Sequence, residues 1–246
     1  MGNAEGINAL QEMIDRSVSI VFFGGAGVST ESGVPDFRSV DGLYSQRYDY
    51  PPETMLSHDF FLNHTGEFFR FYRDKLLLSG VKPNPAHLKL AELERAGRLR
   101  AVVTQNIDGL HGDAGSREVL ELHGSVRRNY CMECGKFFDE DYIRESAGVP
   151  RCGCGGVVKP DVVLYGEALD GGTVERAVRH IRAADMLIIG GTSLVVYPAA
   201  ALLHYFHGSR LAVINRSPTP MDSEAGLLIK GSIGEVLSQI SVKKRG

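Results

Sequence analysis

Short apolar runs that alternate with segments of helical periodicity constrain the fold of this chain most. Each run is partly β-branched, and most end at Gly, Thr or Asn, as buried strands often do. The runs lie at residues 18–23, 101–103, 186–189 and 211–214. Between them, apolar residues recur at helical spacing, for example at Val174, Ala177 and Ile181. This alternation predicts an α/β protein whose mostly parallel sheet is covered by helices on both faces.

Two regions interrupt the alternation. Residues 36–80 are rich in aromatic and polar side chains and show no obvious strand. Residues 125–159 contain all four cysteines and many glycines. We therefore expect both regions to be insertions that together build a second, smaller domain.

Composition limits the class of protein further. The chain has 246 residues, of which 43% are hydrophobic, and a formal net charge of −3. That apolar content is enough for a full core, which excludes a disordered chain and a disulfide-stapled miniprotein. The nearly neutral charge argues against tight, nonspecific binding to nucleic acid.

The sequence shows no membrane or export signal that we can identify. No stretch reaches the roughly 18 apolar residues of a transmembrane helix, so we expect no membrane partner. Residues 1–6 lack the basic start and the apolar run of a signal peptide. We expect a cytoplasmic monomer whose four cysteines stay reduced and serve metal ligation or catalysis rather than disulfides.

A glycine-rich turn follows the first predicted strand. In residues 24–29 (Gly-Gly-Ala-Gly-Val-Ser), glycines would let the backbone approach a pyrophosphate, and a helix starting there would favour its negative charge. Thr30 replaces the third glycine of the usual dinucleotide fingerprint. The preceding strand and the polar residues after the turn favour a nucleotide site. The alternative is a turn that needs glycine only for tight packing.

Four cysteines form two close pairs. Two residues separate Cys131 from Cys134, and one residue separates Cys152 from Cys154. Two such pairs fit one tetrahedral Zn²⁺ held by four thiolates, which makes the metal structural rather than catalytic. The short second spacing requires a turn, which Gly153 and the glycines after it permit. The alternative is four small buried cysteines without a metal.

Polar residues cluster after the second predicted strand. Residues 104–111 (Thr-Gln-Asn-Ile-Asp-Gly-Leu-His) follow its carboxyl end, where parallel sheets bind ligands. A turn that caps the next helix would explain the same residues equally well. His123 follows another apolar run, and on its own it is more typical of a structural histidine than of a catalytic one.

Taken in order, these motifs resemble those of the sirtuins, the NAD-dependent protein deacylases. The matching segments are residues 25–29, 32–38, 84–87, 104–108, 123–124, 165–167, 191–194 and 213–215, with the four-cysteine region among them. The resemblance implies a Rossmann-type NAD-binding domain at residues 1–35, 81–124 and 160–246. It also implies a small domain, with a helical part and a four-cysteine zinc module, at residues 36–80 and 125–159. NAD and acyl-lysine would meet in the cleft between the two domains.

The resemblance further implies a role for each matching residue, with His123 as the general base. The residues expected to bind NAD are Gly25, Ala26, Gly27, Thr30, Phe37, Arg38, Gln105, Asn106, Ile107, Asp108, Gly191, Thr192, Ser193, Asn215 and Ile233. Those expected to hold the substrate as an extended strand are Val163, Gly166, Glu167, Val195, Val196 and Tyr197. The four expected zinc ligands are Cys131, Cys134, Cys152 and Cys154.

The implied activity is NAD-dependent deacetylation of protein lysines, in which the acetyl group passes to ADP-ribose and nicotinamide is released. One alternative is an ADP-ribosyltransferase, because some relatives use the same cofactor with another acceptor. A second alternative is a zinc-ribbon module that binds DNA or protein. Basic residues around the cysteines are offset by acidic ones, which argues against that module.

Two positions bear on the choice of acyl group. Family members that remove negatively charged acyl groups carry Tyr and, three residues later, Arg in the helix of the small domain. The matching positions here are Phe69 and Tyr72, which predict a preference for uncharged acyl groups. Gly24 and Tyr165 also depart from the family pattern, which commonly has Thr and Phe there.

Overall fold

A parallel sheet organises the computed structural model, which describes residues 3–36 and 50–243. Within those residues, six strands lie in the order β3-β2-β1-β7-β8-β9, and every neighbouring pair is parallel. The strands are β1 (Ile20–Gly24), β2 (Leu99–Thr104), β3 (Val119–Glu121), β7 (Met186–Gly190), β8 (Arg210–Asn215) and β9 (Leu227–Lys230). The predicted parallel sheet is confirmed. The four predicted runs form its central strands, whereas the sequence did not predict the edge strands β3 and β9.

The register brings the carboxyl ends of the central strands to one edge. Gly24, at the end of β1, pairs with Thr104 of β2 on one side and with Gly190 of β7 on the other. The chain order reverses direction at β1, since β2 and β3 continue on one side and β7 to β9 on the other. A reversal of this kind leaves a crevice outside the strand ends, where open α/β sheets bind ligands.

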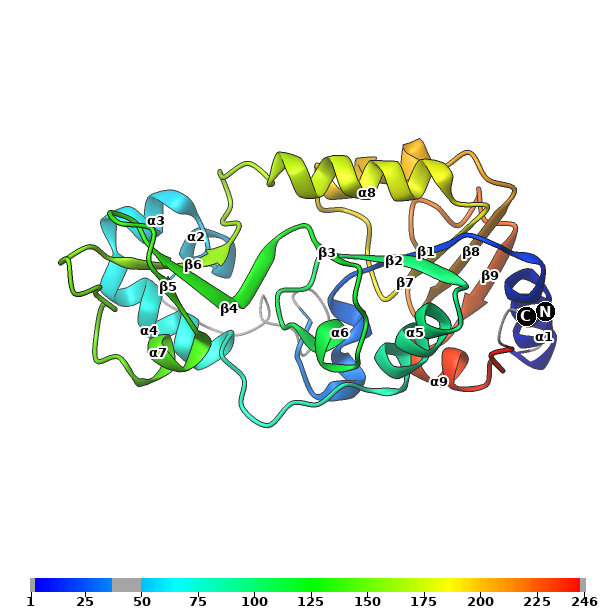
Figure 1. Cartoon of the computed structure of the whole chain (residues 1–246), viewed down its shortest axis with the longest axis horizontal. Coiled ribbons are helices and arrows are strands. Elements are labelled where there is room, and N and C mark those ends of the chain that lie inside the picture. Colours follow the sequence, from blue (N-terminus) through cyan, green and yellow to red (C-terminus); the bar gives the residue numbers. More distant parts are fainter. Residues whose placement is uncertain (1–2, 37–49, 244–246) are drawn as a thin grey trace.

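Helices cover both faces of the sheet (Figure 1). On one face lie α1 (Asn3–Arg16), α5 (Pro85–Arg95) and α9 (Ile233–Ser238). On the other lie α8 (Gly171–Ala183) and the 3-10 helix η4 (Ala199–Tyr205). Successive side chains of a strand point to opposite faces, so Phe22 and Phe23 of β1 enter the two different cores.

Helix α5 is capped at its start and followed by a glycine at its end. The Oδ1 atom of Asn84 accepts a hydrogen bond from the Ala86 amide at 2.9 Å, and the Asn84 amide donates to Nδ1 of His87 at 3.2 Å. This reciprocal cap satisfies amides that the helix itself leaves unpaired. Gly97 follows the helix with a φ of +72°, a conformation that glycine adopts without strain.

Helices and strands from residues 52–75 and 124–162 pack around a third hydrophobic core, and we call this part the small domain (Figure 1, left). Its helices are α2 (Pro52–Met55), α3 (His58–Asn63), α4 (Thr65–Lys75) and α7 (Glu140–Glu145). Its antiparallel strands are β4 (Gly124–Cys131), β5 (Phe137–Phe138) and β6 (Val158–Val162), in the order β5-β4-β6. Aromatic side chains of α3 and α4, including Phe61 and Phe68 in edge-to-face contact, form its core.

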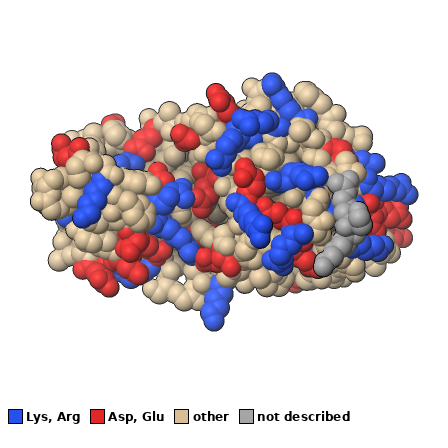
Figure 2. Space-filling view, in the orientation of Figure 1, with Lys and Arg blue, Asp and Glu red and all other residues tan. Residues whose placement is uncertain are grey.

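Three short elements complete the described chain: η1 (Ala26–Val28), η2 (Thr30–Ser32) and α6 (Leu110–Asp113). They all lie at the carboxyl edge of the sheet, next to the small domain. Figure 2 shows basic and acidic side chains interspersed over both parts of this face of the molecule. Among the described residues, we find no helix with the length and apolar character needed to cross a membrane.

Candidate active site

A cavity of about 920 Å³ lies between the carboxyl edge of the sheet and the small domain. Volumes of this order are typical of ligand sites. The predicted residues that line it are Gly25, Ala26, Gly27, Thr30, Gln105, Asn106, Ile107, Asp108, His123, Val163, Gly166, Glu167, Gly191, Thr192, Ser193, Val196, Tyr197, Asn215 and Ile233. Val195 is exposed and is not among the described residues that line the cavity. Phe37 and Arg38 lie outside the described residues.

The glycine-rich turn packs closely against the turn after β7. The Gly27 amide donates to the Gly191 carbonyl at 2.8 Å, and a Cβ atom at Gly27 would lie 2.8 Å from that same oxygen. A Cβ atom at Gly25 would lie 2.9 Å from Cβ of Thr192. Close backbone packing therefore requires both glycines, whether or not a nucleotide binds. The 3-10 turns η1 and η2 follow in place of the expected helix start.

Ser29 joins the glycine-rich turn to the polar segment after β2. Its hydroxyl donates to Oδ2 of Asp108 at 2.6 Å and accepts from the Asn106 side-chain amide at 3.0 Å. The other carboxylate oxygen of Asp108 accepts from the Leu110 amide at 2.9 Å. Two residues predicted to bind NAD are thus oriented by a buried serine that sequence reasoning did not assign to the site. Its position within the glycine motif was the available signal.

His87 lies next to the Ser29 hydroxyl. Its Nδ1 atom accepts from the Asn84 amide, so the proton resides on Nε2, which lies 3.5 Å from the Ser29 hydroxyl. Burial lowers the pKa of His87 to about 4, although the charges of Asp108 and Asp113 oppose the shift. The imidazole is therefore neutral at pH 7.

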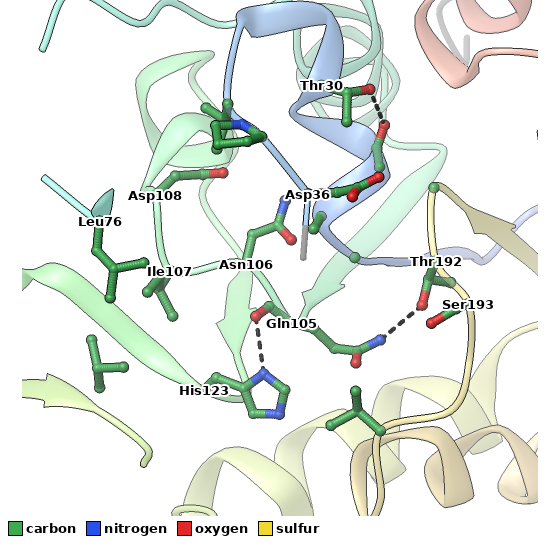
Figure 3. Close-up of a pocket in the computed structure, with 18 of the residues that line it drawn as sticks. Thr30, Asp36, Leu76, Gln105, Asn106, Ile107, Asp108, His123, Thr192 and Ser193 are labelled. Atoms are coloured by element: carbon green, nitrogen blue, oxygen red, sulfur yellow. Dashed lines mark hydrogen bonds between the residues drawn. The ribbon is translucent and has the colours of Figure 1, made fainter. Parts of the chain in front are cut away.

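His123 presents one nitrogen as a base. Its Nδ1 atom lies 3.0 Å from the Gln105 carbonyl oxygen, which can only accept, so Nδ1 carries the proton (Figure 3). The Nε2 atom is then left with a free lone pair. Burial lowers the pKa of His123, and the Gln105 hydrogen bond partly offsets this shift. At neutral pH the side chain is an uncharged imidazole that can accept a proton.

Gln105 also links the ends of three strands. Its side-chain amide donates to the Thr192 hydroxyl at 3.1 Å (Figure 3). The Thr192 amide in turn donates to Oδ1 of Asn215, at the end of β8, at 3.2 Å. Residues predicted to bind NAD, from the ends of β2, β7 and β8, therefore form one continuous polar rim along the carboxyl edge of the sheet.

The segment after β6 lies between His123 and the small-domain helices. The Val163 amide donates to the His123 carbonyl at 3.0 Å. The Tyr165 amide donates to Leu56, and the Tyr165 carbonyl accepts from His58, both at 2.9 Å. These bonds place the predicted substrate-binding segment at the cavity wall directly beside the predicted base.

The Glu167 carboxylate is held within the small domain. It lies 2.8 Å from Nδ1 of His58, and it accepts from Nζ of Lys159 at 3.1 Å and from the Leu164 amide at 2.9 Å. Burial raises the pKa of Glu167, but these partners outweigh burial and lower it overall. Tyr197, which also lines the cavity, is 70% exposed, so its side chain is accessible from solvent.

The four cysteines converge at the end of the small domain. Their Sγ atoms all lie within 4.8 Å of one another, with Cys131–Cys154 at 3.4 Å and Cys134–Cys152 at 3.6 Å. Tetrahedral zinc–thiolate geometry needs sulfur–sulfur distances of about 3.8 Å, so this donor set fits one zinc ion. The predicted turn is confirmed by the Gly155 amide, which donates to the Cys152 carbonyl at 2.8 Å. None of the four cysteines is among the described cavity-lining residues, which fits a structural metal.

The two positions predicted to bear on the choice of acyl group are not at the cavity wall. Phe69 and Tyr72 are fully buried in the small-domain core, and neither is among the described residues that line the cavity. Lys75 and Leu76, at the end of the same helix, do line it. The preference for uncharged acyl groups stays a prediction.

The sheet, the cavity at its switch point and the four-cysteine centre define an α/β protein with a ligand-sized cavity and a centre that fits a structural metal. The Sir2 family model matches residues 25–198. A Clostridium acetobutylicum protein named NAD-dependent protein deacetylase is 58% identical over 238 residues, which cover 95% of this chain and 97% of that protein. A Cutibacterium acnes protein of the same name is 53% identical, covering 94% and 96%.

Solved structures agree with the sequence relatives. One described as Sir2 with p53 peptide and NAD⁺ has a TM-score of 0.84 at 39% identity, covering 94% of this chain and 95% of that one. Another, described as Sir2 bound to acetylated peptide, has a TM-score of 0.84 at 36% identity with the same coverage. The chain therefore belongs to the Sir2 family, the sirtuins.

Proposed function

We propose that this chain is an NAD-dependent protein lysine deacetylase. It uses acetyl-lysine, NAD and water, and yields free lysine, nicotinamide and an acetyl ester of ADP-ribose. The observation that carries the proposal is the position of His123. Its unprotonated nitrogen stands between the residues assigned to NAD and the segment assigned to the peptide. Relatives that are more than half identical over nearly their whole length carry the same activity in their names.

NAD fits the polar rim at the carboxyl edge of the sheet. Thr192, Ser193 and Asn215 offer hydroxyl and amide groups for the adenosine half, and Gln105 and Asp108 do so for the nicotinamide half. When bound, NAD supplies the ADP-ribose group that accepts the acetyl group. The Asp108 carboxylate, aimed by Ser29, would accept a hydrogen bond from the nicotinamide carboxamide.

The chain's own chemical step belongs to His123. In its neutral form, Nε2 could accept a proton from a ribose hydroxyl of bound NAD, which would make that hydroxyl oxygen a better nucleophile toward the acyl carbon. The Gln105 carbonyl stabilises the imidazolium that forms, because it keeps its hydrogen bond from Nδ1–H. An amide oxygen is a weak nucleophile, so the preceding step depends on holding the acyl-lysine close to the ribose.

The substrate would bind as an added strand. The segment Val163–Glu167 and the residues Val196 and Tyr197 all line the cavity, and they would flank the peptide. Strand addition uses backbone hydrogen bonds, so it fixes the lysine while tolerating many flanking sequences. The thiolates of the zinc site require a reducing environment, which supports a cytoplasmic location.

The direct test is incubation of the protein with an acetyl-lysine peptide, with and without NAD, followed by mass spectrometry of the peptide. We expect the peptide to lose its acetyl group only when NAD is present. Release of nicotinamide with an intact acetyl-lysine and an ADP-ribosylated protein would instead identify a transferase and contradict the proposal.

A further inference from the structure

Arg127 connects the small domain to the parallel-sheet part of the molecule. It lies on β4, and its guanidinium reaches α6 beyond the end of β2. There Nη1 donates to Oδ1 of Asp113 at 2.7 Å, and Nη2 donates to Oδ2 at 2.5 Å. Both nitrogens bind one carboxylate, so the pair fixes direction as well as distance.

The side chain of Arg127 passes directly over Gly109. A Cβ atom at Gly109 would lie 2.8 Å from Cδ of Arg127 and closer still to its Nε. Gly109 also has a φ of +76°, which favours glycine. Arg127 therefore rests on the backbone of the residue that follows Asp108, and no larger residue leaves room for that contact.

The neighbouring residues of β4 hold the same segment. The Val126 amide donates to the Ile107 carbonyl at 2.9 Å, and the Ser125 hydroxyl donates to the same oxygen at 3.4 Å. Three consecutive small-domain residues thus contact the chain on both sides of Asp108. Asp108 and Arg127 both line the cavity.

The charges around Arg127 favour this arrangement. Burial lowers the pKa of its guanidinium, but the hydrogen bonds and charge of Asp113, with the charges of Glu140 and Asp108, raise it overall. The adjacent Arg128 points to other partners, donating to Glu121 at 2.6 Å and to Asp161 at 2.8 Å. Of these two adjacent arginines, Arg127 is therefore the one that contacts the Asp108 segment.

We propose that Arg127, through Asp113 and Gly109, is a positioning residue that holds the Asp108 segment in its NAD-binding conformation. The inference rests on the proposed function, since it assumes that this segment binds NAD. NAD affinity would then depend on how the small domain is placed. Arg127 would act indirectly, because its guanidinium binds the Asp113 carboxylate. Peptide binding, which uses the Val163–Glu167 wall, should depend on it little.

The test measures NAD binding by titration calorimetry in the absence of peptide. The variants are Arg127→Gln, Asp113→Asn, the double variant and Arg127→Lys. Hydrogen–deuterium exchange of residues 105–113 provides a second readout that needs no ligand. The control is Arg73→Gln, which removes hydrogen bonds to the Ile143 and Gly148 carbonyls inside the small domain. Zinc content and melting temperature are measured for every variant.

We expect each single neutral variant to weaken NAD binding about 3- to 5-fold, in line with a half-exposed ion pair. The double variant should lose no more NAD affinity than either single variant, because the two substitutions remove the same contact. The NAD affinity of Arg127→Lys should lie between those of the unaltered chain and Arg127→Gln. The backbone amides of residues 105–113 should exchange faster in the neutral variants. The KM for peptide should stay within twofold.

Three results would overturn the proposal. The first is unchanged NAD affinity and unchanged hydrogen–deuterium exchange in both single variants. The second is an additive loss of NAD affinity in the double variant, and the third is an equal loss of NAD affinity in Arg73→Gln. The last would show a general effect of loosening the small domain. If the unaltered chain binds no NAD at all, the proposed function itself fails, which this design separates from failure of the Arg127 inference.

Discussion

At the scale of single residues, one hydrogen bond decides what His123 can do. The Gln105 carbonyl fixes the proton on Nδ1 and leaves Nε2 as the acceptor. The family resemblance assigned His123 as the base, but the sequence alone could not show which of its nitrogens carries the proton. The hydrogen-bond partner of His123 is a backbone oxygen in the segment after β2, so no side-chain motif reveals it.

Replacing His123 by Ala should remove the base without removing the binding surfaces. We expect kcat/KM for deacetylation to fall about 10²- to 10⁴-fold, while NAD still binds. The matched control is His180→Ala on α8, whose side chain lies 3.4 Å from Glu118. Steady-state kinetics and calorimetry check both variants. Near-normal turnover in the His123 variant would rule out the assigned role.

His87 should make the protein sensitive to acid. The pKa of His87 is about 4 in the folded state because the ring is buried, whereas an unfolded histidine titrates near 6.5. The folded state therefore binds fewer protons, and stability present above pH 6.5 is lost as the pH falls toward 4. The expected loss in the free energy of unfolding between pH 6.5 and pH 4 is about 3 kcal/mol.

Urea unfolding of the unaltered chain and of His87→Asn at pH 7, 5.5 and 4.5 checks this prediction. The free energy of unfolding should fall more steeply with acid in the unaltered chain than in the variant. Parallel pH profiles for the two proteins would contradict the assignment of this proton to His87.

At the scale of elements, the glycines of the glycine-rich turn have a structural reason besides phosphate binding. The sequence predicted both the position of the turn and a phosphate-binding reason for its glycines. In the structure, Gly27 lies against the backbone of Gly191, so packing between the β1 and β7 turns is already sufficient to require it. The nucleotide and packing explanations are therefore compatible rather than exclusive.

A methyl group at Gly27 should separate these two turns. We expect Gly27→Ala to cost about 1–3 kcal/mol of unfolding free energy, because its Cβ would lie 2.8 Å from a backbone oxygen that cannot rotate away. Gly66→Ala is the matched control, since it lies in α4 with nothing within 4 Å of its added carbon. That control should be neutral or slightly stabilising. Equal melting temperatures for the two variants would refute the packing argument.

The four-cysteine centre should hold one zinc ion per chain and support the small domain. We expect Cys154→Ser to lose the metal and to lower the stability of the small domain, because zinc binding is coupled to folding. Metal analysis and proteolysis of the small domain check the outcome. A zinc-free chain, or a Cys154 variant with full activity and unchanged proteolysis, would argue against a structural zinc site.

At the scale of the whole molecule, periodicity predicted the parallel sheet and its two interruptions because the buried strands are continuously apolar. It missed β3 and β9, which are short edge strands with few buried residues. Ser29 and His87 were missed because their partners lie far away in the sequence. The burial of Phe69 and Tyr72 in the core was not predicted, because an aromatic helix shows little difference between its buried and its exposed side.

Acetyl transfer to ADP-ribose is the central claim, and product stoichiometry tests it most directly. A peptide whose lysine carries a ¹³C-labelled acetyl group is incubated with the protein and NAD, and all products are measured by mass spectrometry. The account predicts one nicotinamide and one labelled acetyl-ADP-ribose for each lysine freed, with His123→Ala forming neither at a comparable rate. Labelled free acetate as the first product, or deacetylation without consumption of NAD, would contradict it.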